Sequence, residues 1–163
     1  MNPTDVGFFG SLVDERRIFP DLGGATVDEV LTEMSAGLAR VGVVKDGEDV
    51  ARRLVERERM GSTGLGSGLA IPHCKLKELS EVVLAVGVSR RGVAFPSSDG
   101  VPVTLVFLVL SPADAPALHL QALARISRVI RLPGIAETLR RKETAAEIAA
   151  VLKEAEGRIA VPV

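Results

Sequence analysis

The stretch Gly61-Ser62-Thr63-Gly64-Leu65-Gly66-Ser67-Gly68-Leu69-Ala70-Ile71-Pro72-His73 holds four glycines in its first eight residues, with serine and threonine hydroxyls among them. Glycine opens backbone angles that other residues avoid and lets N–H groups approach a ligand closely. Consecutive N–H groups in a turn form a concave site that suits phosphate. The apolar residues 69–71 then predict a short strand that ends at Pro72 and presents His73. The stretch therefore predicts either a histidine that handles phosphate or an ordinary loop with tight glycine turns.

Two common nucleotide-binding motifs do not fit this stretch. A P-loop needs a lysine after its last glycine, whereas Ser67 follows Gly66 here. The dinucleotide fingerprint G-x-G-x-x-G fails as well, because the spacing Gly64-x-Gly66-x-Gly68 has the wrong last step. If a phosphate binds here, it does so outside these two motifs.

Length and composition narrow the class of protein. A chain of 163 residues favours a single domain over residues 1–163, and 47% apolar residues can supply its core. No apolar run approaches the ~20 residues that span a bilayer, and the N-terminus lacks a signal-peptide pattern, so we expect a cytoplasmic protein without membrane insertion. A single cysteine, Cys74, excludes an internal disulfide. A net charge of −1 and the absence of Trp and Tyr argue against nucleic-acid binding.

Capping residues and apolar periodicity predict the helices. Thr26 with Glu29, and Thr144 with Glu147, are capping boxes, and a glycine follows each of the two helices that they begin. The predicted helices cover residues 27–41, 47–60, 117–130, 134–141 and 145–156. The inner face of the third is marked by Leu120, Leu123, Ile126 and Ile130.

Continuous apolar, β-branched runs predict buried strands over residues 82–88 and 101–110. Between them, Arg90-Arg91-Gly92 is expected to turn the chain. Helices at both ends of the chain, with buried strands between them, predict an α/β layered domain.

Two further side chains are candidates for a site. Arg57 lies at the edge of the apolar face of helix 47–60, so it points partly inward, although an exposed ion pair is the more common role. His119 lies in the first turn of helix 117–130, where the helix dipole favours an anion and disfavours imidazolium. The alternative for His119 is a half-buried histidine on the face of Leu123 and Ile126.

The pattern Gly61-Ser62-Thr63-Gly64-x-Gly66-x-Gly68-x-Ala70-x-Pro72-His73, preceded by Arg57-Glu58, resembles that of the fructose/mannitol-type enzyme IIA domains of the bacterial phosphotransferase system. This family includes the stand-alone nitrogen-regulatory IIA proteins. The resemblance spans residues 26–152, the core of the domain, and implies a mixed β-sheet flanked by helices. It also implies that His73 carries a phosphoryl group, that His119 in His119-Leu120-Gln121-x-Leu123 assists, and that Arg57 belongs to the site.

The chemistry of these residues agrees with such a role. A neutral imidazole can accept a phosphoryl group and release it again. Transfer then needs in-line positioning and stabilisation of charge on the equatorial oxygens. Arg57 and His119 can supply this stabilisation, and phosphate binding is expected from Ser62, Thr63 and Gly64. No metal or other cofactor is expected, since two histidines and one cysteine make a poor zinc set.

The resemblance implies a phosphotransferase component that accepts a phosphoryl group from an HPr-type phosphocarrier. A free-standing chain favours the nitrogen-regulatory type, acting on a regulatory target protein. One alternative is a sugar-specific IIA subunit that passes the group to a IIB cysteine, and another is a non-catalytic regulatory binding module. A Cys74/His119 hydrolase lacks a clear third member. Cys74 itself is either a small buried residue or a redox-sensitive thiol beside the site.

Overall fold

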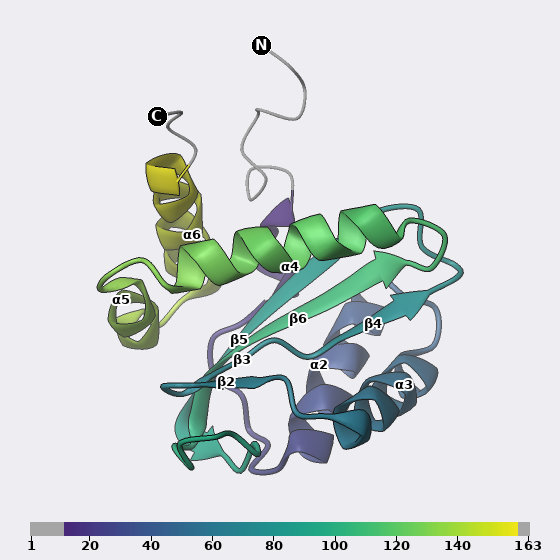
Figure 1. Cartoon of the computed structure of the whole chain (residues 1–163), viewed down its shortest axis with the longest axis horizontal. Coiled ribbons are helices and arrows are strands. Elements are labelled where there is room, and N and C mark those ends of the chain that lie inside the picture. The colour runs from purple at the N-terminus through teal and green to yellow at the C-terminus, as the bar shows by residue number, and fades with distance from the viewer. Residues whose placement is uncertain (1–11, 160–163) are drawn as a thin grey trace.

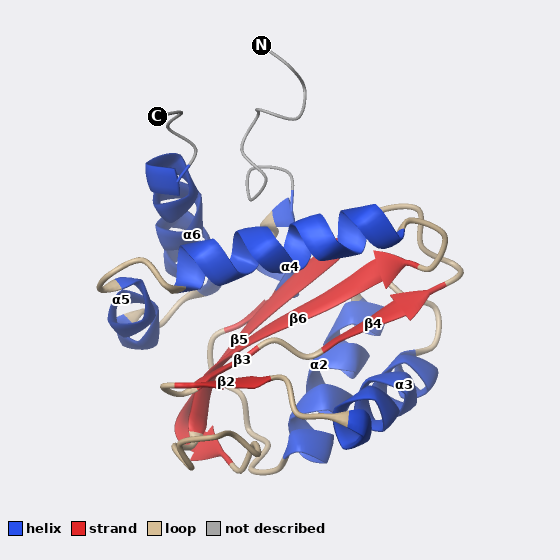
Figure 2. Ribbon diagram, in the orientation of Figure 1, coloured by secondary structure: helices blue, strands red, loops and turns tan. Residues whose placement is uncertain are grey.

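The computed structural model describes residues 12–159, so the two ends of the predicted domain, 1–11 and 160–163, lie outside the described part. The described chain is a layered α/β structure in which helices cover both faces of a mixed sheet (Figures 1 and 2). In Figure 1, helix α4 crosses one face of the sheet, α2 and α3 lie against the other, and α5 and α6 stand at one end. This architecture confirms the predicted fold class.

The sheet is built around its longest antiparallel pair. Its strands are β1 (Ile18–Phe19), β2 (Gly64–Gly66), β3 (Leu69–Ala70), β4 (His73–Leu76), β5 (Val83–Val93) and β6 (Val103–Pro112). The order is β1-β5-β6-β3-β2, and β4 also pairs with β6. The pairs β5–β6 and β2–β3 are antiparallel, whereas β1–β5, β3–β6 and β4–β6 are parallel. Strand β6 therefore has β5 along one side and β3 followed by β4 along the other.

The helices follow the sequence prediction closely. A short 3-10 helix, η2 (Glu15–Arg17), precedes α2 (Val27–Arg40), α3 (Gly47–Met60), α4 (Pro116–Ile130), α5 (Ile135–Arg141) and α6 (Ala145–Ile159). Thr26 caps α2 by accepting the N–H of Glu29 at 3.2 Å, and Thr144 accepts the N–H of Glu147 at 3.2 Å. The Glu29 carboxylate reaches the N–H of Ala25, one residue before the position that the capping box predicts.

Three local expectations were wrong. Helix α6 does not end before Gly157 but continues to Ile159, and Gly157 lacks the positive φ that Gly42 has after α2. Arg90-Arg91-Gly92 does not turn the chain: β5 continues to Val93 through an irregular register. The segment is fixed from outside, since the Arg90 guanidinium donates hydrogen bonds to carbonyls of α5 and of the residue after it, Arg140 at 2.8 Å and Lys142 at 2.7 Å.

The third wrong expectation concerns the inner face of α4. Leu120 is 68% exposed and Leu123 is only partly buried. The buried side chains of this helix are His119, Ala122, Ile126, Val129 and Ile130. The buried stripe follows the helical spacing from 119 through 122 and 126, but it includes a histidine and an alanine where leucine seemed the better core residue.

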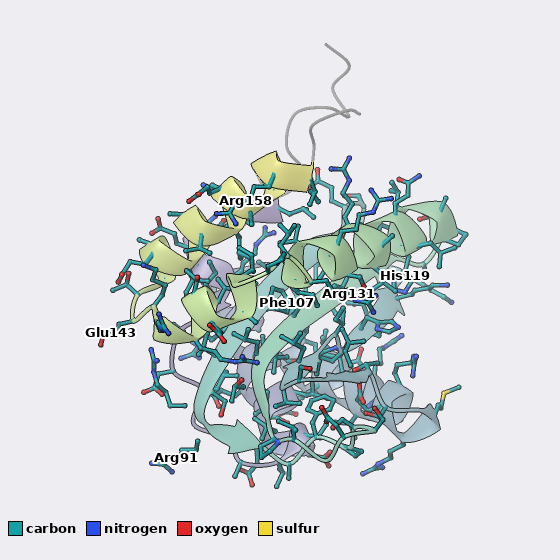
Figure 3. The ribbon with its side chains drawn as sticks, turned by 60° about the vertical axis from the view of Figure 1, so that its left-hand side comes forward. Arg91, Phe107, His119, Arg131, Glu143 and Arg158 are labelled. Carbon is teal, nitrogen blue, oxygen red and sulfur yellow. The ribbon has the colours of Figure 1, made fainter. Side chains whose placement is uncertain are left out.

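Strand β6 separates two hydrophobic clusters. Its alternate residues Leu105, Phe107 and Val109 pack toward α4, α5 and α6, with Phe107 fully buried (Figure 3). The residues between them, Val106, Leu108 and Leu110, pack toward α2 and α3. Both faces of the strand are covered, which explains its continuous apolar sequence. Ser111 is two residues after Val109, so by the same alternation it belongs to the face covered by α4.

None of the helices within residues 12–159 combines the length and the apolar character needed to cross a membrane.

Candidate functional site

The second half of the glycine-rich stretch forms a hairpin between β2 and β3. Its two turn residues, Ser67 and Gly68, have φ of 56° and 78°, as in the tight turns that favour glycine. A Cβ atom on Gly68 would lie 2.8 Å from the Arg140 guanidinium. These later glycines therefore serve a tight turn, in agreement with the ordinary-loop interpretation of this half.

Two residues far away in the sequence hold the hairpin. The Asp99 carboxylate accepts the N–H of Ser67 at 2.7 Å. Several hydrogen bonds lower the pKa of Asp99, and this one has the largest effect. Arg140 donates to the Ser67 carbonyl and to the Thr104 hydroxyl, each at 2.7 Å. Sequence reasoning missed both residues, since no local pattern signals contacts between segments so widely separated.

The first half of the stretch is tied to α3. Thr63 is buried, and both its N–H, at 3.0 Å, and its hydroxyl donate to the Glu58 carboxylate. The Ser62 hydroxyl donates to the Pro96 carbonyl and accepts the N–H of Gly64 at 3.1 Å. All three residues expected to bind phosphate thus have internal hydrogen-bond partners in this structure.

His73 begins a strand and does not end one. The chain leaves β3 at Ala70, and β4 starts at His73, with the N–H of Val109 bound to the Pro72 carbonyl at 2.9 Å between them. The half-buried His73 ring places Nδ1 2.8 Å from the Ile71 carbonyl oxygen. Since a carbonyl only accepts, Nδ1 carries the hydrogen, and the lone pair of the neutral ring lies on Nε2.

His119 lies opposite His73. The two ring centroids are 5.2 Å apart and the ring planes meet at 52°. His119 is only 6% exposed, and its Nδ1 is 2.7 Å from the Ser111 hydroxyl oxygen. Burial lowers the pKa of His119, and repulsion from the nearby basic groups His73, Lys75 and Arg57 lowers it further. Figure 3 shows His119 on α4, at the opposite end of the molecule from Arg91 and Glu143.

Two basic side chains, Arg57 and Lys75, lie close enough to the imidazoles to lower the pKa of His119. The half-buried Arg57 donates to the Gly61 carbonyl at 3.0 Å, which keeps the guanidinium at the start of the glycine-rich stretch. Lys75 follows His73 by two residues on β4, so it belongs to the same face of the strand. Nothing in the sequence pattern distinguishes Lys75 from a solvated surface charge. Together these groups form a positively charged site that suits an anion.

Cys74 points away from this site. It packs against the cluster beneath α2 and α3, the face opposite the one that carries His73. Burial raises the pKa of its thiol to about 12. A thiol of this kind is a weak nucleophile, and no contact joins it to His119, whose Nδ1 is bound to Ser111. The geometry therefore gives no support to the Cys74/His119 hydrolase.

Among residues 12–159, no group of three or more His, Cys, Asp or Glu side chains is arranged to hold a metal ion. The residues gathered at the site are two imidazoles and two cationic side chains, which suit an anionic group better than a cation.

The fold is a layered α/β domain, and its site holds two facing imidazoles close to basic side chains. The family model described as "Phosphoenolpyruvate-dependent sugar phosphotransferase system, EIIA 2" matches residues 11–155. The chain belongs to this family, and the resemblance stated from the sequence is confirmed.

Nitrogen regulatory proteins are among the relatives of this chain. The chain is 40% identical to the nitrogen regulatory protein of Bradyrhizobium diazoefficiens over 141 residues, which cover 86% of this chain and 92% of that protein. It is 34% identical to the nitrogen regulatory protein of Pseudomonas aeruginosa over 129 residues, 79% of this chain and 84% of the relative.

Solved structures give the same fold. Nitrogen regulatory protein IIA-Ntr from Neisseria meningitidis matches with a TM-score of 0.80 and 31% identity, covering 88% of this chain and 97% of that one. IIA mannitol from Escherichia coli matches with a TM-score of 0.69 and 21% identity. The match covers 85% of this chain and 97% of that one, and at this identity it supports the fold alone.

Proposed function

We propose that this chain is a phosphohistidine carrier of the nitrogen-regulatory type, which accepts a phosphoryl group from an HPr-type phosphocarrier on Nε2 of His73. The observation that carries the proposal is the hydrogen bond from Nδ1 of His73 to the Ile71 carbonyl. It assigns the hydrogen to Nδ1 and leaves the Nε2 lone pair as the nucleophile, in a ring that faces His119 and lies among basic groups.

The transfer step balances without any further reagent. The Nε2 lone pair attacks the phosphorus of the donor's phosphohistidine, a new N–P bond forms, and the donor's N–P bond breaks and returns its electron pair to the donor ring. The phosphorylated His73 ring, with Nδ1 still protonated, carries a positive charge that the Ile71 carbonyl stabilises. The same charge makes His73 a good leaving group for the next transfer.

Arg57 and His119 stabilise the transferring group. Both are donors, and negative charge spreads over the equatorial oxygens during phosphoryl transfer. The Arg57 guanidinium can bind two oxygens at once through its planar fork. Phosphate binding by Ser62, Thr63 and Gly64 stays part of the proposal, and it requires these residues to exchange the internal partners described above.

The likeness to nitrogen regulatory proteins favours a regulatory target over a sugar permease as the downstream partner. A sugar-specific IIA subunit, which passes its phosphoryl group to a IIB cysteine, is the second candidate. It is favoured by 34% identity, over 117 residues, to the fructose-specific EIIABC component of Bacillus subtilis, although the match covers only 18% of that protein. A complex of enzyme IIA and phosphorylated enzyme IIB for mannitol from Escherichia coli shares the fold, with a TM-score of 0.70. Both candidates act in the cytoplasm.

The test is phosphorylation in a reconstituted system. Labelled phosphoenolpyruvate, enzyme I and HPr should label the wild-type chain with an acid-labile phosphoryl group, and His73→Ala should abolish the label. Persistent full labelling of a folded His73→Ala variant would overturn the assignment. Absence of label on the wild type would instead favour the non-catalytic binding module. Chasing the labelled protein with a IIB domain then separates the regulatory candidate from the sugar-specific one.

A further inference from the structure

A buried serine contacts the second histidine of the site. Ser111, near the end of β6, is 0% exposed, and its hydroxyl oxygen lies 2.7 Å from Nδ1 of His119. It follows an apolar run, Leu105 to Leu110, and occupies the alternate position that faces α4. A polar side chain at such a position is costly to bury unless its hydrogen bond is satisfied.

We propose that Ser111 is a positioning residue that holds His119 in the tautomer with hydrogen on Nε2. The hydrogen bond can run in either direction. If Nδ1 of His119 donated, the Ser111 hydroxyl hydrogen would need a further acceptor in the protein interior. Within the described chain, His119 is the only side chain or backbone group to which this hydroxyl is hydrogen-bonded. The hydroxyl therefore donates to Nδ1, and a neutral His119 carries its hydrogen on Nε2.

The two histidines then have opposite tautomers. His73 is protonated on Nδ1 by its contact with the Ile71 carbonyl, and His119 is protonated on Nε2 by its contact with Ser111. His73 offers a lone pair at Nε2, whereas His119 offers an N–H at the same ring position. One ring can thus attack phosphorus while the other donates to a phosphoryl oxygen. This assignment of roles rests on the proposed function, and the Ile71 carbonyl and the Ser111 hydroxyl together make the two neighbouring imidazoles unequal.

Burial supports the proposal at a second point. The same environment that excludes water from Ser111 lowers the pKa of His119 and keeps its ring neutral. A protonated His119 would carry hydrogen on both nitrogens and would not need Ser111 to choose between them. The choice of tautomer by Ser111 therefore applies at pH values above the pKa of His119, where its ring is neutral.

The direct test is nitrogen NMR of the unphosphorylated protein with labelled histidine, well above the imidazole pKa. We expect wild-type His119 to show a protonated Nε2 and an unprotonated Nδ1. Ser111→Ala should lose this preference and show both tautomers in exchange, whereas Ser111→Thr, which keeps the hydroxyl, should retain it. A wild-type His119 with hydrogen on Nδ1 would overturn the proposal, as would an unchanged tautomer in folded Ser111→Ala.

A rate measurement links the tautomer to transfer. Ser111→Ala should still be labelled at His73 but should pass the group on about fivefold more slowly, the effect of losing one hydrogen bond. Ser89→Ala is the matched control, because Ser89 is also buried and also loses a hydrogen bond, to the N–H of Gly92. The control should transfer at the wild-type rate, and equal slowing in both variants would mean a merely structural role for Ser111. If His73 is never labelled in any variant, the proposed function fails while the NMR result for His119 still stands.

Discussion

The Glu58 carboxylate holds Thr63 at two points, through its backbone N–H at 3.0 Å and through its hydroxyl. Glu58 lies in the last turn of α3, next to Arg57, and Thr63 lies just beyond the end of this helix. The two hydrogen bonds therefore fasten the start of the glycine-rich stretch to the helix that carries Arg57. A phosphoryl group that binds Thr63 must compete with this carboxylate.

Glu58→Ala should weaken this connection. Hydrogen bonds to a charged group contribute roughly 1.5–3 kcal/mol, so we expect the free energy of unfolding to fall by about this amount in urea titrations. Transfer to an acceptor should also slow, because the loop is held less firmly, and Glu58→Gln, which keeps one acceptor oxygen, should lie between Ala and wild type. Faster labelling in Glu58→Ala would show instead that the carboxylate obstructs phosphate binding.

Arg57 should matter for transfer more than for stability. Arg57→Ala removes one hydrogen bond, to the Gly61 carbonyl, from a half-buried side chain, so the free energy of unfolding should change by no more than about 1 kcal/mol. The phosphoryl-transfer rate should fall strongly, and Arg57→Lys should restore it poorly, because an ammonium lacks the planar fork. A lysine variant as fast as wild type would mean that any positive charge suffices.

His119 should assist transfer without carrying the phosphoryl group. Loss of one positioned donor costs ~3 kcal/mol of barrier, or about a hundredfold in rate. His119→Ala should therefore still be labelled to completion at His73, but it should release the label slowly in a chase with unlabelled HPr. A complete lack of label would move the carrier role to His119, and an unchanged chase would leave His119 as a core histidine.

Cys74 should be inert in the folded protein. A pKa of about 12 leaves very little thiolate near neutral pH, so alkylation by iodoacetamide should be far slower than in the urea-unfolded chain. Cys74→Ala should be labelled at His73 as fast as wild type. Rapid alkylation of the folded protein, with loss of labelling, would revive the redox-sensitive thiol.

Local sequence signals predicted the helices and the fold class. Capping residues such as Thr26 and the apolar periodicity of α2 and α3 depend on neighbours within a few residues, and those elements lie where they were expected. The family pattern likewise brought attention to His73, Arg57 and His119, and the structure brings the two histidine rings together with Arg57 close enough to affect His119. Their roles stay predictions.

The residues that sequence reasoning missed act across long separations. Asp99 and Arg140 hold the hairpin from loop and helix positions that no short pattern connects to Ser67. Ser111 follows the predicted strand 101–110, and its importance depends on which face of β6 it belongs to. The predicted inner face of α4 was also wrong. The helix is rotated about its axis relative to the prediction, so that His119 is buried and Leu120 is exposed.

The strict alternation of β6 also limits how the gene can change in length. Side chains in a strand switch faces with every residue, so one inserted or deleted codon between Val103 and Leu110 would exchange the two faces of all that follows. The hydroxyl of Ser111 would then turn toward α2 and α3, and Leu110 after an insertion, or Pro112 after a deletion, would take its place beside the His119 imidazole. We therefore expect a change in the length of β6 to disrupt the site, so the number of residues in this strand is as much a part of the site as their identity.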